Sequence, residues 1–143
     1  MKRIDGKPYE KHDYRNNSHE YVDNFKNYLD CVSWLINGIY WEAKYPRVLS
    51  RDDFKKQVLA GKNKLMGLTD ISADYEGSIE FTSRFTSIEE PFLLYDPINI
   101  TFKEKISEFS GDEILFHSVD HLPAEMPKEA SNHFGSKLMP FIL

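Results

Sequence analysis

The chain has 143 residues, of which 41% are hydrophobic and 29% are charged, as is usual for one globular domain with its own core. Its formal net charge of −5 argues against a nucleic-acid binder that relies on phosphate contacts, because such proteins carry a basic patch. One cysteine excludes an internal disulfide, and no apolar run is long enough for a signal peptide or a membrane span.

The first part of the chain predicts a helix and then a strand. Residues 1–17 are polar and predict a loop or linker rather than a core element. Ser18 can cap a helix that ends near Asp30, because the apolar residues between them recur at helical spacing. Residues 31–41, CVSWLINGIYW, predict a buried central strand of a parallel sheet, with Cys31 as a small buried group.

A second helix and strand follow. Ser50 predicts the cap of a helix that has acids in its first turn and ends before Gly61. Residues 65–81, LMGLTDISADYEGSIEF, begin with a short apolar run that predicts the next strand. This alternation of helix and strand is typical of a parallel α/β sheet.

The last third of the chain contains more short strands. FLLYD after Pro91 and ILFHSVD from Ile114 each predict a strand, whereas residues 98–106 fit either a strand pair or an irregular excursion. Pro127 predicts the first turn of a helix that continues to the end of the chain.

Two carboxylates, Asp70 and Asp74, flank Ser72 directly after the strand predicted at residue 65. Open α/β sheets bind ligands outside the carboxyl ends of their strands, so this pair could exchange protons with a ligand or hydrogen-bond to it. In the alternative interpretation one carboxylate caps the following turn and the other is solvated, since Asp is common at strand ends and turns.

Three histidines, His117, His121 and His133, are candidate metal ligands. Strand residues four positions apart share a face but lie about 13 Å apart, too far to bind one ion, and no cysteine is near them. No metal site is therefore predicted. His121 follows Asp120 at a strand end and is better placed to contact a ligand or exchange a proton.

The pair Asn37 and Gly38 follows the first predicted strand. A glycine there either lets a ligand approach the backbone closely or serves a tight turn, and both interpretations stay open. The chain contains no glycine-rich GxGxxG turn of the kind that binds a dinucleotide pyrophosphate.

Several long motifs carry a family resemblance. LINGIYWEAKYPRVLS, DISADYEGSIEF, IEEPFLLYDP and HSVDHLPAEMPKEASNHFG, with the lead-in KRIDGKPYEKHDY, resemble the lysine-ketoglutarate reductase half of the bifunctional aminoadipic semialdehyde synthases over nearly the whole chain. More distantly, the chain is similar to fungal saccharopine dehydrogenase and alanine dehydrogenase, whose corresponding motif also has two Asp residues before a glycine.

The resemblance implies an α/β fold in two parts. Residues 1–126 would be the latter part of a Rossmann-like parallel-sheet domain, with residues 1–17 as a linker. Residues 127–143 would begin the helical segment that returns to the substrate domain. The phosphate-binding turn would then lie upstream of Met1, and the natural protein would continue beyond Leu143.

The implied reaction is the reductive condensation of L-lysine with 2-oxoglutarate to give saccharopine, with NADPH, or alternatively NAD, as the cofactor. The parent enzyme would be a homo-oligomer of the mitochondrial matrix. The chain itself carries no targeting segment, and alone it would stay in the cytoplasm. The family's Lys and His acid/base pair lies in the upstream substrate domain, so no complete catalytic machinery is expected here.

The resemblance also implies cofactor contacts, residue by residue. Asp120 would help to position the nicotinamide end, and His121 would contact it. The positions that match dinucleotide contacts in the family are Gly38, Tyr40, Ile71, Asp74, Val119, Asp120, His121 and Leu122.

The sequence is compatible with two functions of different classes. In the first, the chain is a fragment of the reductase that is inactive alone. In the second, it is a non-catalytic interaction or regulatory piece that associates with itself or with the full-length enzyme through unpaired strands.

Overall fold

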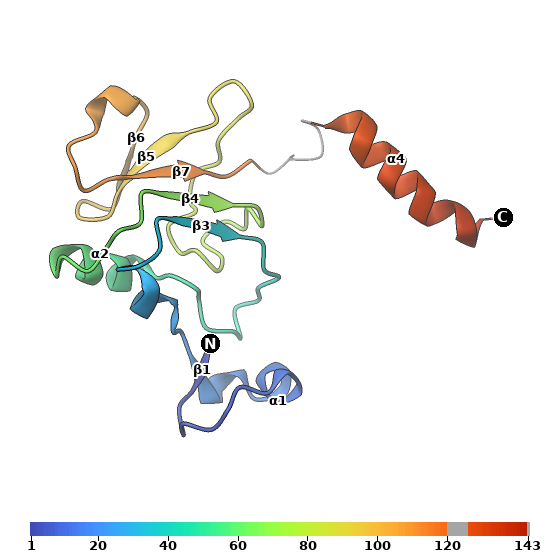
Figure 1. The fold of residues 1–143 in the computed structure, drawn as a ribbon, viewed down its shortest axis with the longest axis horizontal. Helices are drawn as coiled ribbons and strands as arrows, with labels where there is room; N and C mark the ends of the chain where they lie inside the picture. The colour runs from blue at the N-terminus through green and yellow to red at the C-terminus, as the bar shows by residue number, and fades with distance from the viewer. Residues whose placement is uncertain (120–125, 143) are drawn as a thin grey trace.

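The fold is built around a mixed five-stranded sheet (Figure 1). The computed structural model describes residues 1–119 and 126–142. The strands lie in the order β3-β4-β7-β5-β6. Their bounds are β3 Trp34–Asn37, β4 Gly67–Asp70, β5 Leu93–Asp96, β6 Thr101–Lys103 and β7 Ile114–His117.

Only one side of the sheet is parallel. β3, β4 and β7 run parallel, whereas β5 is antiparallel to both β7 and β6. The prediction of a parallel sheet is therefore wrong for β5, which alone runs against the other four strands. The short link between β5 and β6 explains why these two strands pair antiparallel, because a parallel connection needs a dozen or more residues. Asp96 Oδ1 accepts hydrogen bonds from the backbone of Ile98 and Asn99 and closes that link.

Helix α2, Arg51–Leu59, is the crossover between β3 and β4 and matches its prediction. The Ser50 hydroxyl accepts a hydrogen bond from the Asp53 amide at 3.1 Å, which caps the helix. Gly61 has a φ of +66° just beyond the helix end, a conformation that favours glycine. Phe54 turns inward from α2 and is fully buried.

The core is an aromatic stack between α2 and the sheet. Phe81 and Tyr95 stack with ring centroids 4.1 Å apart, and Phe54 lies 5.7 Å from Phe81. Phe116 of β7 adds a tilted contact to Phe81. The burial of these rings, together with the leucines and isoleucines around them, fixes β4, β5 and β7 beneath α2.

Strand β3 lies at the edge of the sheet, so the prediction of a buried central strand is wrong. It pairs with β4 on one side, and within the described residues no strand pairs with its other side. Ile36 is 65% exposed and Trp34 is 39% exposed. Cys31, predicted to be buried, is exposed as well. An apolar run thus identified the strand but not its place in the sheet.

The first 30 residues differ most from their prediction. Residues 1–17 contain a strand and a helix, β1 Lys2–Arg3 and α1 Lys11–Asn16, where a loop or linker was expected. The helix expected over residues 18–30 is instead η1 Ser18–Glu20, β2 Tyr21–Val22 and η2 Phe25–Tyr28. β1 pairs antiparallel with β2, which holds Tyr21 in an extended conformation.

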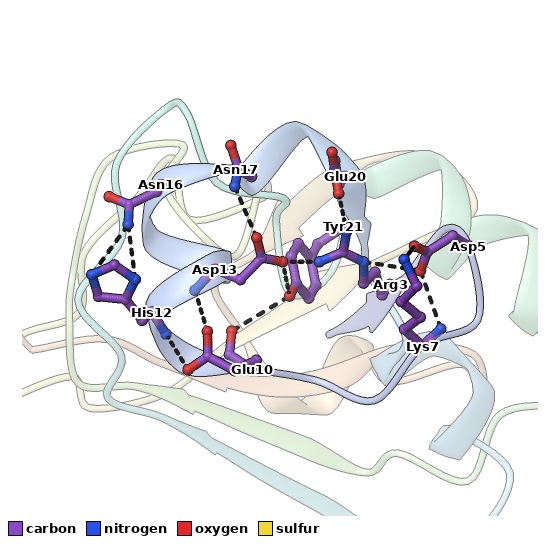
Figure 2. A network of polar contacts seen from close by, with 10 residues as sticks. All are labelled: Arg3, Asp5, Lys7, Glu10, His12, Asp13, Asn16, Asn17, Glu20 and Tyr21. Atoms are coloured by element: carbon purple, nitrogen blue, oxygen red, sulfur yellow. Dashed lines mark hydrogen bonds and ion pairs between the residues drawn. The ribbon is translucent and has the colours of Figure 1, made fainter.

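A group of polar side chains, here called the lead-in cluster, joins β1, α1 and β2 (Figure 2). Arg3 bonds to the carboxylates of Asp5, Asp13 and Glu20. The Tyr21 hydroxyl donates to Asp13 Oδ2 at 2.7 Å. These contacts link residues up to 17 positions apart in sequence, so helical spacing within residues 18–30 could not predict them.

The remaining elements are η3 Ile106–Glu108, α4 Pro127–Leu138 and η4 Met139–Phe141. Residues 98–106, left open by the sequence, thus form β6 and the start of η3. Helix α4 begins at Pro127 as predicted, and it has no buried residue. Figure 1 draws it apart from the sheet. Across the described residues, no helix combines the length and apolar character that a membrane crossing requires.

Candidate functional site

The carboxyl ends of β3, β4 and β7 meet at one edge of the sheet because these strands are parallel. Asn37 at the end of β3 lies beside Asp70 at the end of β4. Ser118, just after β7, donates its hydroxyl to the Asp70 carbonyl oxygen at 3.2 Å. The three chain segments that leave this edge therefore start side by side.

A buried hydrogen-bond network, here called the carboxyl-edge cluster, lies beneath this edge. Asp70 is 1% exposed. Its Oδ1 accepts bonds from the Asn37 amide nitrogen and the Ser72 hydroxyl, both at 2.7 Å, and its Oδ2 accepts one from the Thr82 hydroxyl at 2.6 Å. The Asn37 amide nitrogen also lies 2.9 Å from the Ser78 hydroxyl. The cluster consists of Asn37, Asp70, Ser72, Ser78 and Thr82.

These contacts assign different surroundings to the two predicted carboxylates. Both oxygens of Asp70 are occupied by side-chain donors of the protein, so this carboxylate neither caps a turn nor faces a ligand. Asp74 is exposed, and its side chain forms no hydrogen bond with residues 1–119 or 126–142. Its carboxylate can accept hydrogen bonds from a ligand at this edge.

Residues 71–77 form a loop with a constrained backbone, which is called the Asp74 loop below. Ala73 and Glu76 have φ values of 48° and 47°, in the left-handed region that non-glycine residues rarely adopt. A Cβ built on Gly77 would lie 2.5 Å from the Asp74 Cβ. Only glycine therefore permits this turn to pack against Asp74. Backbone strain of this kind persists where the surrounding structure enforces it, and it gathers at binding sites.

Three of the predicted cofactor residues lie next to one another on the edge. A Cβ on Gly38 would meet only the Ile71 Cβ, at 4.0 Å, so the backbone at Gly38 is open to close approach. Ile71 is 46% exposed. Val119 follows Ser118 and is buried, so it can offer its backbone but not its side chain to a ligand.

Tyr40 stands in the segment after β3 and is 81% exposed. Its hydroxyl donates to Glu42 Oε1 at 2.9 Å, and this bond raises the pKa of the phenol. Glu42 in turn pairs with Lys44 at 3.0 Å, and the hydrogen bond from Lys44 lowers the pKa of the Glu42 carboxyl. The tyrosine thus presents a neutral, oriented aromatic face to solvent.

The other predicted contacts, Asp120, His121 and Leu122, lie outside the described residues. His117 is partly buried, and its ring lies 5.5 Å from that of Phe92. Among residues 1–119 and 126–142, no group of three or more His, Cys, Asp or Glu side chains is arranged to hold a metal ion.

Sequence reasoning missed most of the carboxyl-edge cluster. The sequence indicates Asn37 only as part of its pair with Gly38, and it gives no indication of a role for Ser78 or Thr82. One signal was present, since Asn37 is a polar residue at the end of an otherwise apolar strand. A buried amide needs hydrogen-bond partners, but the sequence does not say that these come from residues 33 to 41 positions away.

Comparison with known proteins gives relatives over nearly the whole chain. No family model matches it. The chain is 35% identical over 159 aligned residues to mitochondrial alpha-aminoadipic semialdehyde synthase of Bos taurus, which covers 99% of this chain and 16% of the relative. The corresponding synthase of Arabidopsis thaliana is 36% identical over 95% of this chain and 12% of the relative.

A second group of relatives is more distant. Saccharopine dehydrogenase [NAD(+), L-lysine-forming] of Candida albicans is 32% identical over 76% of this chain and 25% of its own length. The resemblance to the aminoadipic semialdehyde synthases and, more distantly, to fungal saccharopine dehydrogenase is thereby confirmed. The chain spans about one sixth of the length of the animal synthases. It is, over nearly all of its residues, a homologue of one segment of the aminoadipic semialdehyde synthases.

Proposed function

We propose that this chain is part of an oxidoreductase of lysine degradation and that its carboxyl edge forms part of a nicotinamide dinucleotide site. The main support is the arrangement of Gly38, Ile71 and Val119 side by side at the ends of three parallel strands. Ligands of open α/β sheets bind at such strand ends. The fold fits the latter part of a Rossmann-like domain, to which the antiparallel β5 and β6 are added.

The residues present fit one end of a dinucleotide and not its pyrophosphate. The open backbone at Gly38 and the exposed Ile71 offer an apolar surface for a flat ring, and the loop that begins at Ile71 adds the exposed carboxylate of Asp74. The glycine-rich phosphate turn has no counterpart in these 143 residues. Asp120, His121 and Leu122 directly follow Val119 in sequence, and the proposal includes them as further contacts.

The proposed reaction of the parent enzyme is the condensation of L-lysine with 2-oxoglutarate to saccharopine, with NADPH preferred and NAD as the alternative. The bound dinucleotide would supply the hydride. This chain would orient the nicotinamide ring and exclude water from its face, while acid/base groups outside the chain move the protons. The mitochondrial relatives support a mitochondrial location for the parent enzyme.

The proposal is tested by titrating the isotopically labelled chain with NADPH and, separately, with NAD. Amide chemical shifts are followed by NMR, because they detect binding even at millimolar affinity. We expect shifts at Gly38, Tyr40, Ile71, Asp74 and residues 119–122. Titration with inorganic pyrophosphate is the matched control and should leave these amides unmoved. Shifts confined to another surface, or none with either dinucleotide, would refute the assignment.

A second function, self-association, is favoured by the exposed edge of β3. Ile36 and Trp34 are exposed on an edge strand, and such edges pair readily with other strands. Under this hypothesis the chain forms homo-oligomers or binds the full-length enzyme, and it has no catalytic role. Sedimentation of the wild type beside an Ile36→Lys variant tests it, because a charge on the edge should shift oligomers to monomers. A monomer at all concentrations would exclude self-association.

A further inference from the structure

Arg47 lies between two loops that both carry proposed cofactor contacts. Its Nη1 donates to the backbone carbonyl oxygens of Glu76 and Gly77, at the end of the Asp74 loop. Its Nε lies 3.8 Å from Glu80 Oε1. The same guanidinium lies over the Trp41 ring, 5.0 Å from its centroid. One side chain thus contacts the segments before and after α2.

Trp41 fixes the other side of this arrangement. Its indole N–H donates to the carbonyl oxygens of Tyr45 at 3.1 Å and Pro46 at 3.3 Å. The Tyr45 amide donates to the Glu42 carbonyl oxygen at 2.9 Å and closes a turn. Residues 39–46, called the Tyr40 loop below, therefore form a closed unit on which the Arg47 guanidinium rests.

The Asp74 loop needs an external restraint because its backbone is strained. Glu76 has a positive φ, and its amide donates to the Thr82 carbonyl oxygen at 2.7 Å. Arg51 donates to the Glu76 carboxylate at 2.5 Å, but this contact restrains only the side chain. Arg47 is the side chain that bonds the two backbone carbonyls directly.

We propose that Arg47 is a positioning residue that couples the Tyr40 loop to the Asp74 loop and so fixes the two sides of the dinucleotide surface relative to each other. The ligand side of this inference depends on the proposed function. The coupling itself concerns only the two loops. An arginine suits the task, because a planar guanidinium bonds two acceptors at its edge and stacks on an aromatic face, which a lysine does not reproduce.

The test compares Arg47→Met, Arg47→Lys and a matched control, Arg84→Met. Arg84 pairs with Glu104 at 3.1 Å, and both side chains are exposed. Three readouts are taken without ligand: exchange rates of the bonded Glu76, Gly77 and Tyr45 amides, the indole N–H shift of Trp41, and the melting temperature. NADPH-induced shifts in both loops are the fourth.

We expect Arg47→Met to speed exchange of all three amides by about tenfold or more, since hydrogen bonds to charged groups are among the stronger ones. The Trp41 indole signal should move, and Arg84→Met should change neither. Arg47→Lys should recover part of the exchange protection, and NADPH-induced shifts should weaken in both loops of Arg47→Met.

Each other outcome has a defined meaning. Wild-type exchange rates in Arg47→Met would overturn the coupling. Faster exchange with undiminished NADPH-induced shifts would mean that Arg47 has only a structural role. It would overturn the proposal that Arg47 positions the dinucleotide surface. Absence of NADPH shifts in the wild type would refute the proposed function, while the ligand-free exchange rates would still decide whether Arg47 couples the loops.

Discussion

The lead-in cluster and the carboxyl-edge cluster are both networks around aspartate, but they differ in their exposure to water. In the lead-in cluster, Arg3 faces three carboxylates, of which Asp5 and Glu20 have side chains 40% and 42% exposed (Figure 2). In the carboxyl-edge cluster a single carboxylate, Asp70, is enclosed by an amide and hydroxyl groups.

This difference predicts what each network contributes. Charged pairs near solvent are screened, and water replaces a lost partner at little cost. A buried donor that loses its partner has no water to replace it, so its full desolvation penalty appears in the stability. The carboxyl-edge cluster should therefore be an anchor of the fold, and the lead-in cluster an attachment whose strength varies with pH.

Asp70→Ala should cause the largest loss of stability, because it acts on the buried carboxyl-edge cluster. The substitution leaves the Asn37 amide and the Ser72 and Thr82 hydroxyls without their common acceptor, and we expect a loss of about 3 to 5 kcal/mol in unfolding free energy. Urea denaturation measures it. Asp74→Ala, four residues along and exposed, is the control and should change stability by less than about 0.5 kcal/mol. Equal losses in both variants would contradict the assignment of Asp70 as a buried anchor.

Gly77→Ala should have the next largest effect and should act on the Asp74 loop. The new Cβ would lie 2.5 Å from the Asp74 Cβ, so the turn must shift, at a cost of roughly 1 to 3 kcal/mol. Urea denaturation and the amide shifts of residues 71–77 measure the change. Gly135→Ala is the control, since nothing lies within 4 Å of a Cβ there. Unchanged loop shifts in Gly77→Ala would show that the close approach does not fix Asp74.

The sequence predicted those elements whose signals are local. The Ser50 cap and the glycine after α2 lie within a few residues of the helix that they bound, and the apolar runs of β4, β5 and β7 are short and distinct. The spacing of Tyr21, Phe25 and Tyr28 was equally distinct but misleading. There, pairing of β2 with β1 outweighs helical periodicity, and no local pattern reports a partner 18 residues away.

The place of the candidate site in the fold was predictable because it also depends on local signals, namely the ends of strands. Gly38, Ile71 and Asp74 follow strands that the sequence identified, and parallel strands place their ends together. The sequence could not separate Asp70 from Asp74, because burial decides between them. Asp70 is enclosed by Asn37 and Thr82, which lie 33 residues before it and 12 residues after it. Arg47 was missed because its acceptors are backbone carbonyls, which carry no sequence signal.

The smallest expected effect is the pH dependence of the lead-in cluster. Hydrogen bonds from Tyr21 and then Asn17 hold the pKa of Asp13 below its usual value. Since the folded pKa is the lower one, Asp13 stabilises the fold above its unfolded pKa of about 3.9, and this contribution is lost as the pH falls through the folded pKa. The melting temperatures of the wild type and Asp13→Asn should therefore differ at pH 6 and converge towards pH 3. Glu89→Gln, at an exposed position, should follow the wild type throughout. A difference that is constant with pH would mean that the Asp13 carboxylate acts through packing rather than through its charge.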